Sequence, residues 1–157
     1  MNLCSEVLKT LAGKTLVTAE SCTGGGIGAM LTAVPGSSAV YKGGIICYSN
    51  WVKTQILGVD EAVLKALGPV SAPVAEAMAE GACRVLDAYA SVSVTGLAGP
   101  GGDEYGNEAG TVFIGCRIGK DTWVREHHFS GDRESVRLQA AQSALRMLLD
   151  KEKGAGK

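Results

Sequence analysis

The order of apolar and polar positions predicts helices and strands that alternate along most of the chain. Apolar residues at helical spacing predict an amphipathic helix that begins the chain and ends at Gly13: Leu3, Val7, Leu8 and Leu11. Apolar and β-branched runs typical of buried strands follow at 15–19, 44–48 and 90–95. Further helices are expected from the turn at 20–26 to about 32, and at 50–57, 60–68, 71–86 and 132–150.

Near the C-terminus, two apolar segments, 110–118 and 122–129, flank Gly119-Lys120-Asp121 and predict a β-hairpin. Helices and strands mixed in this way predict an α/β fold. We expect a three-layer α/β/α sandwich around a mixed, mostly parallel sheet of about five strands. At 157 residues the chain fits a single domain, 1–157, with a frayed tail at 153–157.

Charge and cysteine usage narrow the expected partners. The net charge of −1 gives no field of one sign, so we expect neither nucleic acid nor membrane as a partner. The first helix lacks the long apolar core of a signal peptide and no run is long enough to span a membrane, which favours a cytoplasmic protein. Five widely spaced cysteines without a CxxC pair predict free thiols. No acidic or histidine cluster has metal-site spacing, so we expect no metal and no cofactor.

The segment 20–26 lies where the first buried strand is expected to turn into a helix. Such a turn exposes side chains at the carboxyl edge of a sheet, where open α/β folds bind ligands. Ser21 is placed there to act as a nucleophile beside amides that can hold an oxyanion. A plain helix cap by Ser21 or Thr23, followed by flexible glycines, explains the pattern equally well. The residues expected to contact a ligand in this turn are Cys22, Thr23, Gly24 and Gly25.

Two nucleotide-binding motifs are present only in part. Gly24-x-Gly26-x-x-Ala29 resembles a dinucleotide fingerprint, but Tyr48-Ser49-Asn50 stands where its acidic residue is expected. Gly13-Lys14-Thr15 resembles the end of a phosphate-binding P-loop, but Leu8 replaces the leading glycine and a strand follows the motif. Neither a nicotinamide-cofactor Rossmann domain nor a P-loop is therefore expected.

A serine nucleophile needs a base, and Tyr48-Ser49-Asn50 with Lys53 follows the second predicted strand. A lysine can serve where burial lowers its pKa, and a neighbouring tyrosine can relay the proton or orient the amine. We expect Lys53 and Tyr48 to face the same crevice as Ser21. Taken alone, the simpler interpretation makes Tyr48 a strand-end aromatic residue and Lys53 a solvated helix charge.

Two more segments are expected at the same edge of the sheet. After the third predicted strand, Thr95 is expected to donate a hydrogen bond into the pocket. Gly96 and Gly99 belong to a glycine-rich loop that suits a nucleotide or phosphate, although the composition also fits a flexible connection. Asp132 is expected to cap the last helix, and Arg133 to bind a carboxylate or phosphate from its first turn.

Several of these motifs occur together in a specific order. They are Thr18-Ala19-Glu20-Ser21-Cys22-Thr23-Gly24-Gly25, then Val34-Pro35-Gly36-Ser37-Ser38, then Tyr48-Ser49-Asn50 with Lys53, then Val94-Thr95-Gly96-Leu97-Ala98-Gly99-Pro100. Together they resemble the C-terminal domain of the competence/damage-inducible protein CinA, the stand-alone form of which is nicotinamide-nucleotide amidase. The resemblance extends from the first predicted helix to the last.

The resemblance implies hydrolysis of nicotinamide mononucleotide to nicotinic acid mononucleotide and ammonia, in NAD salvage and without a metal. It assigns the chemistry to a serine, a lysine and a tyrosine, which map onto Ser21, Lys53 and Tyr48. It also implies a homo-oligomer, a dimer or trimer. Many members carry an extra N-terminal domain for which this chain has no room, and the opening Met1 favours a natural stand-alone protein.

Two alternatives remain open at the level of sequence. The first is a module that binds a pyridine nucleotide or a partner protein without turnover, although such a module has no need of Ser21, Tyr48 and Lys53 together. The second is a serine hydrolase whose base is His127 or His128. Adjacent residues of a strand point to opposite faces, so at most one of these histidines can enter a site.

Overall fold

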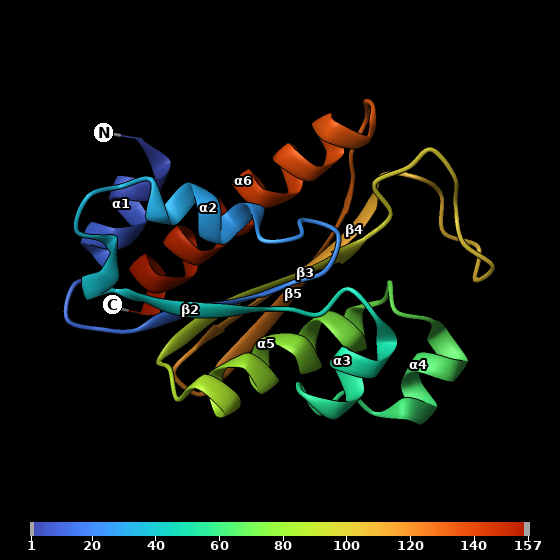
Figure 1. Cartoon of the computed structure of the whole chain (residues 1–157), viewed down its shortest axis with the longest axis horizontal. Coiled ribbons are helices and arrows are strands. Elements are labelled where there is room, and N and C mark those ends of the chain that lie inside the picture. The colour runs from blue at the N-terminus through green and yellow to red at the C-terminus, as the bar shows by residue number, and fades with distance from the viewer. Residues whose placement is uncertain (1, 156–157) are drawn as a thin grey trace.

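The computed structural model describes residues 2–155 and shows a five-stranded sheet between two layers of helices (Figure 1). In sheet order the strands are β2 (Tyr41–Ile46), β1 (Leu16–Glu20), β3 (Ala90–Gly96), β4 (Thr111–Ile118) and β5 (Asp121–His128). β1 pairs in parallel with β2 and β3, whereas β4 is antiparallel to both of its neighbours. Four strands therefore run in one direction, which confirms the mixed, mostly parallel sheet.

Helices cover both faces of this sheet, so the expected three-layer α/β/α sandwich is confirmed (Figure 1). One layer holds α1 (Leu3–Thr10), α2 (Gly26–Thr32) and α6 (Arg133–Ala155). The other holds α3 (Asn50–Gln55), α4 (Glu61–Leu67) and α5 (Ala72–Leu86). A 3-10 turn, Ser37–Ala39, precedes β2. None of the helices within residues 2–155 is both long and apolar enough to cross a membrane.

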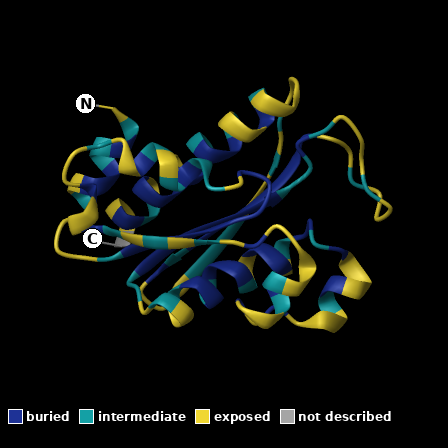
Figure 2. Ribbon diagram, viewed as in Figure 1, coloured by how far each residue is buried: buried dark blue, intermediate teal, exposed yellow. Residues whose placement is uncertain are grey.

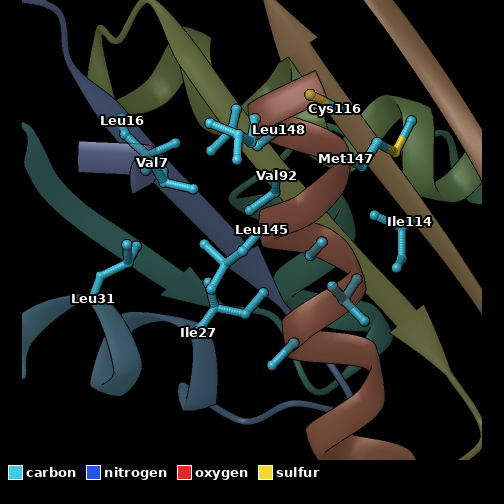
Figure 3. Packing of buried hydrophobic residues seen from close by; sticks show 14 of the residues in the cluster. Val7, Leu16, Ile27, Leu31, Val92, Ile114, Cys116, Leu145, Met147 and Leu148 are labelled. Carbon is cyan, nitrogen blue, oxygen red and sulfur yellow. The ribbon is translucent and has the colours of Figure 1, made fainter. Parts of the chain in front are cut away.

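The core is divided between the two faces of the sheet. Leu145 and Leu148 of α6 pack with Val92 and Ile114 of the central strands (Figure 3). Met78 of α5 belongs to a separate cluster on the opposite face. Burial of each large aliphatic side chain contributes roughly 1.5–3 kcal/mol. The central strands are buried almost throughout (Figure 2), so they form a fixed platform for the segments that leave their carboxyl ends.

Two elements extend beyond their expected bounds. β2 begins at Tyr41 because it is an edge strand whose residues are alternately half-buried and exposed, a pattern that accommodates polar side chains. The last helix continues past Asp150 to Ala155, which includes part of the tail expected to be frayed; residues 156–157 lie outside the described chain. Its end is held by tertiary contacts, because Glu152 bonds to Lys14 and Tyr89.

Candidate active site

Ser21 follows directly on β1 and lies at the carboxyl edge of the parallel strands. Its amide donates to Val94 O at 2.9 Å, which extends the pairing of β1 with β3 by one residue. The chain then turns through Gly24 and Gly25, both at positive φ, before α2 begins. Gly25 is the N-cap of α2 in a left-handed conformation that a residue with a Cβ rarely adopts. The glycines thus allow a strand to pass into a helix directly behind the serine.

A buried carboxylate, that of Glu20, braces this turn. Glu20 Oε1 accepts from Thr23 Oγ1 at 2.8 Å and from the amide of Ile27 at 2.9 Å, and Oε2 accepts from the amide of Gly28 at 3.1 Å. The amides of Ile27 and Gly28 are the donors that an N-cap side chain would satisfy. The expectation that Ser21 or Thr23 caps α2 is therefore wrong, because Glu20 reaches the helix start from the preceding strand. The Ser21 hydroxyl stays available for other contacts.

Lys53 is the polar partner of that hydroxyl. Its side chain projects from α3, is only 1% exposed, and donates from Nζ to Ser21 Oγ at 3.0 Å and to Cys47 O at 2.7 Å. Ser49 starts α3 as its N-cap, with Oγ accepting from the amide of Val52. Burial lowers the pKa of Lys53 below its usual value, because desolvation disfavours the ammonium form. No ion pair recorded within residues 2–155 involves Lys53.

Cys22, the residue next to Ser21, is a second potential nucleophile. Burial raises the pKa of its thiol to about 11, and burial raises that of the nearby Cys47 to about 11 as well. Only the thiolate is a strong nucleophile. Both thiols are therefore protonated at neutral pH, and Ser21, with an amine on its hydroxyl, is the better candidate.

A cavity of about 300 Å³ opens in front of Ser21 and Lys53. Expected ligand contacts found in its wall are Cys22, Tyr48, Thr95, Gly96, Gly99 and Arg133, and the remaining wall residues are Asn50, Pro69, Val70, Leu97, Ala98 and Gly101. Three expected contacts, Thr23, Gly24 and Gly25, are not part of the wall. They lie in the turn behind Ser21, where their conformation shapes the site.

Three backbone amides of the turn within the described chain, those of Cys22, Thr23 and Gly25, have no backbone acceptor. The amide of Gly24 donates to Ser21 O, and that of Gly26 to Thr23 O. Neither Cys22 nor Thr23 donates from its amide to a backbone carbonyl within the described chain. Of the three, the amides of Cys22 and Thr23 follow Ser21 directly in the chain and are the candidates for an oxyanion hole.

The rim of the cavity is formed by Tyr48 and Arg133. Arg133 Nη1 donates to Gly99 O at 2.7 Å and Nη2 to Tyr48 Oη at 3.3 Å, so one guanidinium joins the helix start to both neighbours. Tyr48 is 64% exposed and contacts Arg133, with no hydrogen bond recorded between it and Ser21 or Lys53. As expected, Asp132 caps α6, by accepting from the amide of Ser135 at 2.9 Å.

Thr95 lines the cavity, but its hydroxyl proton is directed elsewhere. Thr95 Oγ1 donates to Pro69 O at 2.8 Å, so the expected hydrogen bond from this group into the pocket is not present. The hydroxyl instead ties the end of β3 to the segment before α5. Its oxygen keeps acceptor capacity toward a ligand.

Arg137 is the functional candidate that the sequence reasoning missed. Its Nε donates to Cys22 O at 3.0 Å and its Nη2 to Thr23 O at 3.3 Å, so α6 holds the turn from behind. Arg133 and Arg137 are four residues apart and share one helix face. That spacing is the signal the sequence contains, but only the fold shows that the face is turned toward Ser21.

The two histidines lie away from this cavity. Both belong to the edge strand β5, and neither contributes to the cavity wall. His127 stacks on Phe129 with ring centroids 5.0 Å apart, and His128 contacts Glu126. No group of three or more histidine, cysteine, aspartate or glutamate side chains within residues 2–155 is arranged to hold a metal ion.

Fold and site together define an α/β domain with a buried serine–lysine pair at the carboxyl edge of its parallel strands. Residues 2–151 match the family model of the CinA C-terminal domain. The chain belongs to this family, as the resemblance of its motifs implied.

Relatives and solved structures agree with that assignment. A CinA-like protein from Syntrophobacter fumaroxidans is 46% identical over 87% of this chain, and one from Mycolicibacterium gilvum is 43% identical over 96%. These matches cover 32% and 36% of the relatives, so the chain spans about a third of their length. A crystallised CinA superfamily protein from Klebsiella pneumoniae superposes with a TM-score of 0.94 at 32% identity, covering 97% of this chain and 96% of that one. One from Escherichia coli gives 0.92 at 37% identity, covering 94% and 87%.

Proposed function

We propose that the Ser21 cavity hydrolyses the carboxamide of nicotinamide mononucleotide to nicotinic acid mononucleotide and ammonia. The observation that carries this proposal is the buried 3.0 Å contact between Lys53 Nζ and Ser21 Oγ. Burying an ammonium group without a carboxylate partner is costly, and a module that only binds a nucleotide gains nothing from it. A buried amine with a lowered pKa can instead take the serine proton.

The chemistry follows from the positions of these groups. The proton of Ser21 Oγ passes to Lys53 Nζ while Oγ bonds to the amide carbon. The amides of Cys22 and Thr23 stabilise the oxyanion, and one such donor contributes roughly 3 kcal/mol to lowering the barrier. The carbon–nitrogen bond then breaks, and the Lys53 ammonium gives its proton to the departing ammonia. Water attacks the ester carbon, gives a proton to Lys53 and releases the acid, and Ser21 recovers its proton from the lysine.

The rim supplies groups that suit the rest of the substrate. Arg133 offers a guanidinium to the phosphate, next to the backbone of Gly99. The pyridinium ring of the substrate is a cation, and the exposed ring of Tyr48 suits it through a cation–π contact. Tyr48 is proposed to orient this ring and to assist proton transfer to the leaving nitrogen. Binding energy from the phosphate would hold the amide within reach of Ser21.

The test is ammonia release from nicotinamide mononucleotide by the purified protein without added metal. Wild type is expected to release ammonia, Ser21→Ala to lose the activity, and Ser5→Ala, a serine on α1 outside the cavity, to keep it. Trapping an acyl group on a residue other than Ser21 would overturn the assignment. If the nucleotide raises the melting temperature without any release of ammonia, the chain is a binding module.

A further inference from the structure

A second cavity, of about 380 Å³, lies between α3, α4 and the loop that joins β3 to β4. We call it the aromatic groove, and its lining residues are Asn50, Trp51, Thr54, Glu61, Leu64, Lys65 and Tyr105. Trp51 is 66% exposed and Tyr105 is 39% exposed, so two aromatic rings of one groove face solvent. A large ring left in water forgoes the burial energy that it normally contributes. Two exposed rings in one groove are suited to stacking on a ligand with a planar face.

Tyr105 is placed in this groove by a closed turn. Asp103 accepts from the amides of Tyr105 and Asn107, at 3.0 and 2.9 Å, and the Asp103 amide donates back to Asn107 O. Asn107 Nδ2 also donates to Val70 O at 3.2 Å, which fastens the turn to the body of the domain. The ring packs on the backbone of Gly68, where a Cβ would meet it at 2.5 Å. The hydrogen bonds of this turn and the contact with Gly68 therefore fix the position of the Tyr105 ring.

The aromatic groove adjoins the cavity that holds Ser21. Asn50 lines both, and the loop that lines the Ser21 cavity at Gly99 and Gly101 continues to Tyr105 in the groove. In Figure 1 this loop, drawn in yellow to gold, projects beyond the carboxyl ends of the parallel strands. A ligand that extends from the Ser21 cavity past Asn50 can therefore reach the groove.

We propose that the aromatic groove binds the planar base of a purine nucleotide. Its two rings can stack on the base, and a base also has donors and acceptors along its edge. Glu61 offers a carboxylate to an exocyclic amine, and Lys65 offers a donor to ring nitrogens. The phosphate of such a nucleotide lies toward Arg133, away from Glu61. A dinucleotide then occupies both cavities, with its pyridine half beside Ser21; that part of the inference rests on the proposed function, whereas base binding does not.

The first test uses Trp51 as its own reporter. The chain has two tryptophans, and the other, Trp123, lies on β5 with the Lys151 amine 4.8 Å from its ring centroid. Trp123→Phe leaves Trp51 as the sole fluorescent tryptophan. Titration of this protein with adenosine monophosphate is expected to give a saturable quench. Tyr105→Ala in the same background is expected to weaken the apparent affinity roughly five- to hundredfold, and Tyr105→Phe to retain it.

Controls and a second readout make the outcome decisive. Val85→Ala, an exposed apolar position on α5 outside the groove, is expected to leave the titration unchanged. No quench overturns the proposal. So does a quench that Tyr105→Ala leaves intact, because the base would then bind elsewhere. Trp51 emission that changes with protein concentration and ignores the nucleotide also overturns it, since a second copy would then cover the groove.

Binding measurements on the Ser21→Ala variant separate this inference from the proposed function. In Ser21→Ala, adenosine monophosphate and the oxidised nicotinamide dinucleotide are each titrated by calorimetry, with nicotinamide mononucleotide as reference. Tighter binding of the dinucleotide than of either half, lost in Tyr105→Ala, supports the spanning arrangement. If wild type releases no ammonia but still binds adenosine monophosphate through Tyr105, the groove stands and the proposed reaction fails. If ammonia is released and adenosine monophosphate does not bind, the reaction stands and the groove proposal is overturned.

Discussion

Two neighbouring parallel strands, β1 and β3, end at the same edge of the sheet and continue into segments of opposite character. The turn 21–25 after β1 is short. Glu20 holds it through the Thr23 hydroxyl and the first amides of α2, and Arg137 holds it through the carbonyls of Cys22 and Thr23. The loop 97–110 after β3 is long and mostly exposed (Figure 2), with its own closed turn near the tip. The segment that carries the proposed nucleophile is thus held by side chains from two elements, and the segment proposed to contact the substrate is the exposed one.

This contrast fits what each segment is proposed to do. A nucleophile and its base must be held within a few tenths of an ångström, because misplacement by 1 Å costs on the order of a hundredfold in rate. Surface loops on a rigid scaffold can differ in length and sequence without disturbing the scaffold. We therefore expect changes in the turn to affect turnover or folding, and changes in the loop to affect ligand affinity.

The largest effect is expected from Lys53→Met, which keeps the volume of the side chain and removes the amine. Ammonia release should fall by roughly a thousandfold or more, because Ser21 loses its base. Substrate binding, measured by calorimetry, should change little. Lys42→Met, at an exposed lysine on β2 whose Nζ donates to Asp87 O, is the matched control and should retain activity. Retention of activity by Lys53→Met would mean that another group is the base.

Wild type and Lys53→Met should also differ in how their stability depends on pH. Burial lowers the pKa of Lys53 in the folded state, so between that value and the unfolded value the unfolded chain binds more protons. Stability of wild type should therefore rise with pH through this window and fall as pH drops through it, relative to Lys53→Met. Activity should increase with pH through the folded pKa of Lys53. Urea titrations of both proteins at several pH values would show whether the unfolding free energy of wild type rises more steeply with pH than that of Lys53→Met.

The second largest effect is expected from Glu20→Ala. It leaves three donors without an acceptor, namely Thr23 Oγ1 and the amides of Ile27 and Gly28. Unsatisfied buried donors of this kind should destabilise the fold by roughly 3 kcal/mol. Glu20→Gln should cost less, because its oxygen can still serve Thr23 and Ile27 while its NH₂ opposes the Gly28 amide. Equal unfolding midpoints for the two variants would show that the carboxylate does not brace the turn.

Much of this brace could not be predicted from the sequence. Hydrophobic periodicity gave the order of the elements, because buried strands and amphipathic helices leave local patterns. A capping residue is expected next to its helix, and so the pattern favoured Ser21 or Thr23. The actual acceptor, Glu20, lies six residues before α2 and points back only because the turn reverses the chain. Such a contact depends on three-dimensional placement rather than on local sequence.

The candidate site was predicted in the same uneven way. Ser21 and Lys53 were expected together because a serine nucleophile requires a base nearby, and the structure does bring their side chains into contact. Their catalytic roles stay a prediction. Tyr48 was expected to face the same crevice as Ser21 and to relay a proton or orient the lysine amine. It does line that cavity, but it is exposed and its hydroxyl contacts Arg133 at the rim. The only sequence signal for Arg137 is its spacing of four residues from Arg133, which places both on one face of the last helix. The local sequence does not show what that helix face contacts.

The third largest effect is expected from Arg137→Ala, in which kcat should fall roughly 10- to 100-fold with a smaller change in KM. The variant frees the carbonyls of Cys22 and Thr23, whose amides are the proposed oxyanion donors. Arg137→Lys should recover only part of the rate, because one ammonium cannot reproduce the planar fork of a guanidinium. A role in folding alone would lower the melting temperature of Arg137→Ala and leave the kcat of its folded fraction unchanged.

The smallest effects should come from replacing two glycines, one in α2 just after the turn 21–25 and one within the loop 97–110. In Gly28→Ala the new Cβ would lie 2.7 Å from Tyr41 Oη, so the 2.8 Å contact between Tyr41 and Thr18 must shift. The gain in helix propensity, about 1 kcal/mol, should not offset this overpacking, and we expect a net loss of about 1 kcal/mol. In Gly101→Ala the Cβ meets nothing within 4 Å. Its stability should change by less than about 0.5 kcal/mol, with any effect confined to ligand affinity. Chemical denaturation of both variants measures the difference directly. Equal losses would show that the loop is packed as tightly as the region behind the nucleophile, and the proposed division between a rigid chemical turn and an open binding loop would then be wrong.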